Sequence, residues 1–169
     1  TPTIRRKVAE MASFFGIQTW FHRSVTELSG GQKQLLNLAS VMVLQPKVLI
    51  LDEPTSQLDP IAASDFLATL SRLNRELGTT VILTEHRLEE AFSLASRVAV
   101  MDKGQLLCTG TPAEVGAELK ANGSTMFLAM PAAMRIWSAV NSDTSCPVSV
   151  CDGRNWLLDY AKTHKLSPI

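Results

Sequence analysis

Two short apolar runs, the first ending in a pair of carboxylates, restrict the fold of this chain more than any other feature. The first run is Lys47–Leu51, followed directly by Asp52 and Glu53, and the second is Thr79–Leu83. Their branched, apolar composition is typical of strands buried on both faces of a parallel sheet. Between them, Pro60–Leu77 has apolar residues at helical spacing. A strand, a helix and a second strand in this order indicate an α/β fold with a largely parallel sheet.

The remaining segments predict further helices and one hairpin. Arg97–Met101 and Gln105–Thr109 flank a tight turn, in which Gly104 occupies a position that requires positive φ. Amphipathic patterns and capping residues predict helices at residues 4–16, 29–45, 88–95, 112–121, 131–140 and 149–164. The last of these begins at Ser149, with Asp152 three residues on, in the manner of a capping box.

The acidic pair after the first run is a candidate centre for chemistry. Ligands of open α/β sheets bind at the carboxyl ends of strands. Asp52 suits Mg²⁺, which prefers carboxylates, waters and phosphate oxygens. Glu53 points elsewhere along the pleat, where it would orient or deprotonate a water. The alternative for this pair is a solvated acidic loop.

A serine followed by two glycines opens one of the predicted helices. The residues are Ser29, Gly30, Gly31 and Gln32. The first N–H groups of a helix have no partner within it, and the helix dipole adds partial positive charge there. Because glycines let an anion approach the backbone closely, this segment is a candidate anion site. The alternative is an ordinary helix cap, and for Ser29-Gly30-Gly31 alone that alternative is favoured.

Two further positions become informative only in combination with the others. Asp59 followed by Pro60 is typical of a helix start, with Asp59 as the N-cap and Pro60 at the first helical position, and this explains Asp59 without any other role. His86 follows Thr84-Glu85 just past the second apolar run, and we expect it on the same sheet edge as Glu53. A lone histidine is usually a structural or surface residue. His86 differs from that case only because it lies at the carboxyl end of a strand.

In order and spacing, these motifs resemble the nucleotide-binding subunit of ABC transporters. Leu28–Gln34 looks like the signature motif of that family, and Val48–Glu53 looks like Walker B. Ser56–Asp59 is similar to the D-loop, and His86 to the switch histidine. The resemblance covers residues 1–110 and implies part of a P-loop NTPase domain that uses ATP and Mg²⁺.

The resemblance also implies a role for each matched residue. Asp52 would hold Mg²⁺ through its water shell, Glu53 would polarise the attacking water, and His86 would contact the γ-phosphate. The ATP held by an opposite subunit would be bound by Ser29, Gly30, Gly31 and Gln32. Asp59 would cross the dimer interface near the phosphate-binding loop of the partner.

The resemblance predicts a domain organisation as well. Residues 1–122 would be the C-terminal part of an ABC ATPase domain, with the helical subdomain and signature helix in 1–45 and the Walker B to hairpin region in 46–110. Residues 123–169 would be an α-rich C-terminal extension or inter-domain linker. The pattern G-x-x-x-x-G-K-[ST] does not occur in the sequence. We therefore expect these 169 residues alone to be unable to hydrolyse ATP.

Two segments narrow the resemblance to one kind of transporter. Thr84–Ala91 and Arg97–Gly104 are similar to the ATPases of energy-coupling-factor and cobalt-type importers, which take up vitamins or transition-metal ions. Met130–Arg135 and Pro147–Leu157 look like the segment that joins two fused ABC domains. The implied partners are a second ABC ATPase domain, as a homodimer, heterodimer or tandem fusion, and an integral-membrane subunit. The implied location is the cytoplasmic face of the membrane, as a peripheral subunit.

Composition weighs against one alternative function. A soluble ABC ATPase that acts on nucleic acid or the ribosome would carry out the same ATP chemistry. However, 16 basic residues balance 16 acidic ones, so no nucleic-acid partner is expected. A structural module with decayed motifs is a further alternative, and the presence of Glu53 and His86 argues against it.

Overall fold

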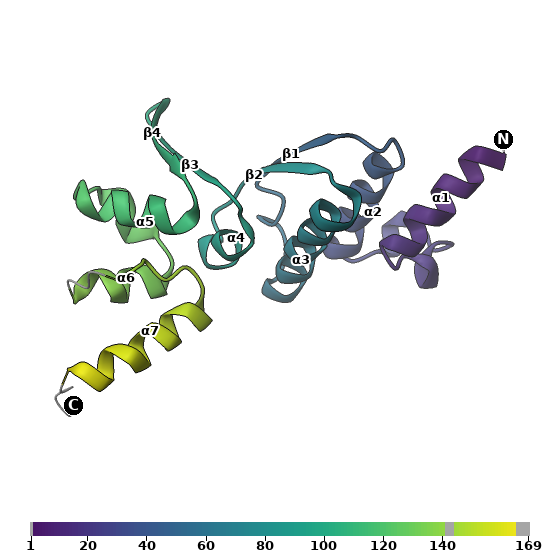
Figure 1. Ribbon diagram of the computed structural model, residues 1–169. Helices are drawn as coiled ribbons and strands as arrows, with labels where there is room; N and C mark the ends of the chain where they lie inside the picture. The colour runs from purple at the N-terminus through teal and green to yellow at the C-terminus, as the bar shows by residue number, and fades with distance from the viewer. Residues whose placement is uncertain (1, 141–143, 165–169) are drawn as a thin grey trace. The chain divides into compact units, whose positions relative to one another are not determined.

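A computed structural model describes residues 2–140 and 144–164 (Figure 1). The chain forms two compact units, an N-terminal unit of residues 1–86 and a C-terminal unit of residues 87–169, and each is described by itself. No helix in the described part is long and apolar enough to span a membrane. The boundaries predicted from the sequence, 1–122 and 123–169, stay a prediction.

The N-terminal unit combines helices with one pair of strands. Its elements are α1 (Pro2–Phe14), the short 3₁₀ helices η1 (Gln18–Trp20) and η2 (Val25–Glu27), α2 (Gly30–Met42), β1 (Val48–Asp52), α3 (Pro60–Leu77) and β2 (Thr80–Thr84). Side-chain caps begin two of the helices, because Ser29 accepts from the N–H of Gln32 and Asp59 accepts from the N–H groups of the first turn of α3. Gly78 ends α3 in the left-handed conformation. The caps at Ser29 and Asp59 agree with the sequence predictions, and Gly78 is the residue type that the left-handed end of a helix favours.

Helix α2 ends earlier than predicted. The sequence places its end near Gln45, whereas the last helical residue is Met42. Leu44 and Gln45 donate to carbonyls three residues back, and Gln45 takes a φ of 53° before Pro46. The last turn of the helix is therefore tighter than an α-helical turn. The left-handed conformation of Gln45 then ends the helix, and the chain continues through Pro46 to the following strand.

Strands β1 and β2 are parallel neighbours, with Asp52 opposite Thr84 at their carboxyl ends. Helices α2 and α3 lie on one side of the pair (Figure 1). Leu49 belongs to the core that the strands share with these helices, whereas Ile50 is 73% exposed. The prediction that these strands are buried on both faces is therefore wrong for this unit. Their residues alternate between inside and outside, because the described residues of the unit cover one face only.

The C-terminal unit packs helices against a hairpin. Its elements are α4 (Leu88–Leu94), β3 (Val98–Asp102), β4 (Gln105–Gly110), α5 (Pro112–Ala121), the 3₁₀ helix η3 (Thr125–Ala129), α6 (Ala132–Ala139) and α7 (Val150–Thr163). Strands β3 and β4 are antiparallel, and Gly104 in their turn has the predicted positive φ, at 78°. Ser149 and Asp152 form the predicted capping box of α7.

The cysteines of this unit are free thiols, and Cys146 does not pair with Cys151. Cys146 is buried in the core, and this burial raises its pKa to about 11.

With a parallel strand pair, an antiparallel hairpin and helices packed on them, the predicted α/β class is confirmed.

Candidate functional site

The carboxyl ends of β1 and β2 are joined by side-chain hydrogen bonds. The hydroxyl of Thr84 donates to Oδ1 of Asp52 at 2.5 Å. The backbone N–H of Glu53 donates both to the hydroxyl of Thr84, at 3.0 Å, and to its carbonyl, at 3.2 Å. Glu53 leaves the strand with a φ of 43°, in the left-handed region that few residues other than glycine adopt. Thr84 therefore fixes the point at which the chain turns out of β1.

Glu53 and His86 meet at this edge of the sheet. Nε2 of His86 lies 2.8 Å from Oε1 of Glu53, and the two residues come from loops that follow different strands. Both side chains are open to solvent. A carboxylate beside an imidazole can orient a water molecule and accept its proton, while the imidazole can donate to an anion. The two predicted catalytic residues are thus brought together, and their roles stay predictions.

The fit of Asp52 to a magnesium ion rests on its donor chemistry. Mg²⁺ is commonly held by one or two carboxylates, with water and phosphate oxygens completing its octahedron. Asp52 supplies such a carboxylate at an exposed strand end, with one oxygen held by Thr84. Within the described residues, no cluster of three or more His, Cys, Asp or Glu side chains forms a complete protein cage. This single carboxylate fits an ion that arrives with a phosphate ligand.

The start of α2 uses its polar side chains as a reciprocal cap. Oγ of Ser29 accepts from the N–H of Gln32 at 3.2 Å, and Oε1 of Gln32 accepts from the N–H of Ser29 at 3.0 Å. Gly30 and Gly31 fall in the first turn, whose N–H groups have no acceptor within the helix. Of the four predicted ligand-binding residues, these two glycines therefore offer the backbone donors that an anion would use.

The remaining predicted site residue, Asp59, caps α3. Its Oδ1 accepts from the N–H groups of Ile61 at 3.0 Å and Ala62 at 2.9 Å. Helix α2 also contacts the loop after β1 directly, because Nε2 of Gln34 donates to the carbonyl of Pro54 at 3.2 Å. The glycine-rich helix start and the acidic loop are thus linked within one compact unit.

Three residues to which sequence reasoning gave no role hold the site in place. Thr84 joins Asp52 and Glu53, while Glu85 accepts from both the N–H and the hydroxyl of Thr55. Their position could have indicated Thr84 and Glu85, because both are polar residues at a strand end directly before His86. Thr55 is fully buried although it lies in a loop.

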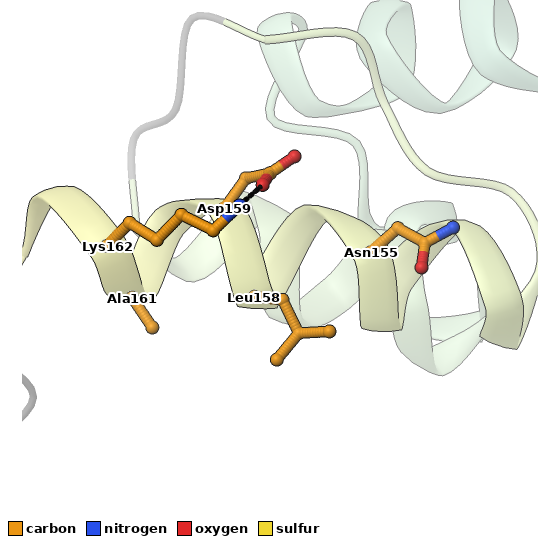
Figure 2. A pocket seen from close by; sticks show the side chains of 5 residues that line it. All are labelled: Asn155, Leu158, Asp159, Ala161 and Lys162. Carbon is orange, nitrogen blue, oxygen red and sulfur yellow. Dashed lines mark hydrogen bonds and ion pairs between the residues drawn. The ribbon is translucent and has the colours of Figure 1, made fainter.

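One surface depression lies on the C-terminal unit. It has a volume of ≈ 520 Å³ and is lined by Asn155, Leu158, Asp159, Ala161 and Lys162. Figure 2 shows that all five side chains come from α7. Lys162 and Asp159 within it form an ion pair at 2.6 Å. The depression contains none of the predicted site residues.

Alanine at Gly30 and at Gly31 is expected to have different effects on stability. A Cβ at Gly30 would approach nothing closer than 4.0 Å, whereas one at Gly31 would lie 3.0 Å from Cβ of Ala62. Because alanine favours helix over glycine, we expect Gly30→Ala to keep or raise the free energy of unfolding, by up to about 1 kcal/mol. Gly31→Ala should lower it, by about 1–3 kcal/mol relative to Gly30→Ala, through overpacking. Urea unfolding of both variants measures the difference, and equal midpoints would contradict the close approach of Gly31 to α3.

Comparison with known proteins identifies the domain type. Residues 3–56 match the family model described as ABC transporter. A Bacillus anthracis protein named as an ABC transporter ATP-binding protein is 55% identical over 116 residues, which are 69% of this chain and 21% of the relative. The spermidine/putrescine import ATP-binding protein PotA of Borreliella afzelii is 42% identical over 126 residues, covering 75% of this chain and 36% of PotA.

A solved structure gives the same result for the fold. The structure of cbiO1 from Clostridium perfringens, described as part of the ABC transporter complex cbiONQ, matches with a TM-score of 0.63 and 35% identity. The match covers 74% of this chain and 51% of cbiO1. Together, these similarities are to the ATP-binding domain of ABC transporters, and the predicted resemblance is confirmed at that level. The chain spans about a fifth of the length of the Bacillus relative, at 21%.

Proposed function

We propose that this chain is part of the ATP-hydrolysing subunit of an ABC-type importer that takes up a small substrate, of the energy-coupling-factor or cobalt class. The observation that carries the proposal is the contact between Glu53 and His86, at 2.8 Å, at the carboxyl ends of two parallel strands. The substrate would be a vitamin or a transition-metal ion. Support for import comes from the similarity to PotA, an import protein by name, and the similarity to cbiO1, described as part of an ABC transporter complex, supports a role in transport.

The proposed chemistry assigns separate tasks to the residues at the strand ends. ATP with Mg²⁺ supplies the phosphoryl group and the metal charge that stabilises its transfer. Asp52 would hold the ion through its water shell. Glu53 would orient the attacking water and accept its proton, and His86 would donate to the γ-phosphate. Thr84 would keep Asp52 and Glu53 at the turn where both face the ligand.

A partner domain would complete the site. The N–H groups of Gly30 and Gly31, with Ser29 and Gln32 around them, would receive the γ-phosphate of ATP bound to a second ABC domain. Asp59 would face the phosphate-binding loop of that partner. Membrane attachment would be peripheral, on the cytoplasmic face, through an integral-membrane subunit. Whether the second domain is another copy or a tandem repeat is decided by the length of the full protein.

The test of this proposal is ATP turnover by the protein purified at its full natural length, with the membrane subunits that accompany it. We expect Mg²⁺-dependent phosphate release that stops when the metal is chelated, because Asp52 would hold the Mg²⁺ that accompanies the phosphates. A protein with no Mg²⁺-dependent turnover in the presence of its membrane subunits would contradict the proposal. Turnover stimulated by RNA, with salt-sensitive binding, would favour the soluble alternative instead.

A further inference from the structure

The side chain of Glu85 joins the loop after β1 to the loop after β2. Its Oε1 accepts from the N–H of Thr55 at 3.1 Å and from the hydroxyl of Thr55 at 2.5 Å. Its Oε2 accepts from the N–H of His86 at 3.0 Å. One carboxylate therefore holds the backbone on which His86 is mounted and the turn that follows Glu53.

Thr55 lies at the centre of that turn. The carbonyl of Thr55 accepts from the N–H of Leu58 at 3.0 Å, and Ser56 donates to the carbonyl of Glu53 at 3.2 Å. Thr55 is 0% exposed, so its N–H and hydroxyl cannot turn to bulk water for another partner. A buried donor without an acceptor is costly, so the turn around Thr55 depends on Glu85.

We propose that Glu85 is a positioning residue for ATP hydrolysis, which holds His86 and Glu53 at their 2.8 Å separation by clasping both loops. The inference rests on the proposed function. Glu85 hydrogen-bonds the backbone beside His86 and the turn after Glu53, so it acts through these two residues. The hydrogen bonds of Glu85 to Thr55 and to the N–H of His86 are called the clasp below. Small errors in the placement of reacting groups reduce turnover strongly, so the clasp is a determinant of rate.

The clasp requires a carboxylate and not merely a polar side chain of the same length. Both oxygens of Glu85 are acceptors, one for Thr55 and the other for His86. Glutamine has one oxygen and one NH₂ group, so it can accept from one loop only and presents a donor to the other. Glu85→Gln thus preserves size and removes the simultaneous hold on both loops.

The experiment compares kcat and the ATP KM of the full-length protein for Glu85→Gln, Thr55→Val and the double variant. The matched control is Glu76→Gln, at an exposed position on α3 of the same unit. We expect Glu85→Gln to lower kcat by about 10–100-fold with KM within about threefold, because the clasp orients reacting groups. The loss of kcat in the double variant should be smaller than the product of the two single losses, because Thr55 and Glu85 act as one unit. Glu76→Gln should match the wild type.

Hydrogen exchange on the same proteins supplies a readout that does not need ATP. We expect faster exchange in Glu85→Gln for peptides that contain Thr55 and His86, with unchanged exchange in α1 and α2. The proposal is overturned if Glu85→Gln keeps the wild-type kcat, if KM rises in step with the loss of kcat, or if exchange accelerates throughout the N-terminal unit. A wild-type protein without ATP turnover would instead defeat the proposed function, and exchange at Thr55 and His86 would then decide whether the clasp exists.

Discussion

Replacing Glu53 with glutamine is expected to lower the ATP turnover of the full-length protein by about 100-fold or more, while ATP binding persists. Glutamine keeps the size of the side chain and can still approach Nε2 of His86, which lies 2.8 Å from Oε1 of Glu53. The amide cannot accept a proton from the attacking water. The loss should therefore fall on kcat, measured by phosphate release, with little change in the affinity for ATP.

A second consequence of Glu53→Gln concerns assembly. If ATP is bound between two ABC domains and is no longer hydrolysed, the ATP-bound pair should accumulate. Size-exclusion chromatography with ATP and Mg²⁺ would show this pair in the variant and not in the wild type. Glu76→Gln, an exposed change of the same chemistry, serves as the control. If turnover survives Glu53→Gln, Glu53 is not the residue that activates the water.

The features that the sequence predicts best are those that depend on a few neighbouring residues. Ser29, Asp59 and Ser149 cap helices as expected, and Gly78 directly follows the predicted helix Pro60–Leu77, where it takes the left-handed conformation. The three capping side chains accept from backbone N–H groups two or three positions on, and the N–H of Gly78 donates to the carbonyl of Asn74, so each interaction is specified locally. The same holds for the hairpin turn, where positive φ favours Gly104.

Features that depend on distant packing could not be predicted in the same way. The apolar composition of β1 predicts burial on both faces, yet composition does not say which faces α2 and α3 cover. The outward side chain of Ile50 results from that arrangement. The early end of α2 is a smaller example, since the turn at Gln45 depends on how the chain enters β1.

The candidate site was predictable in position and only partly in construction. The rule that strand ends share an edge of a parallel sheet predicts Glu53 and His86 at one edge, and in the structure their side chains are in contact there. The rule does not indicate what holds them there. Glu85 reaches Thr55 across 30 positions of sequence, and no local pattern marks such a pair.

The largest expected effect on stability is that of Leu73→Ala, which should lower the free energy of unfolding by about 2–5 kcal/mol. Leu73 is 0% exposed and belongs to the core that joins α3 to α1, α2 and β1. Removing three carbons there leaves a cavity that its neighbours can close only in part. Urea unfolding followed by far-UV circular dichroism measures the change in midpoint.

Leu77→Ala is the matched control, because Leu77 lies one turn further along α3 and is 43% exposed. The same truncation there creates a smaller cavity or none, and alanine is also a good helix former, so a change below about 1 kcal/mol is expected. Equal effects at the two positions would contradict the face that α3 presents to the core.

Because the core under α3 also contains Leu49 of β1, loosening at Leu73 should reach the strand that ends in Asp52. The ATP turnover of Leu73→Ala should then fall at a lower urea concentration than that of Leu77→Ala, which ties the stability of this core to the placement of the acidic loop.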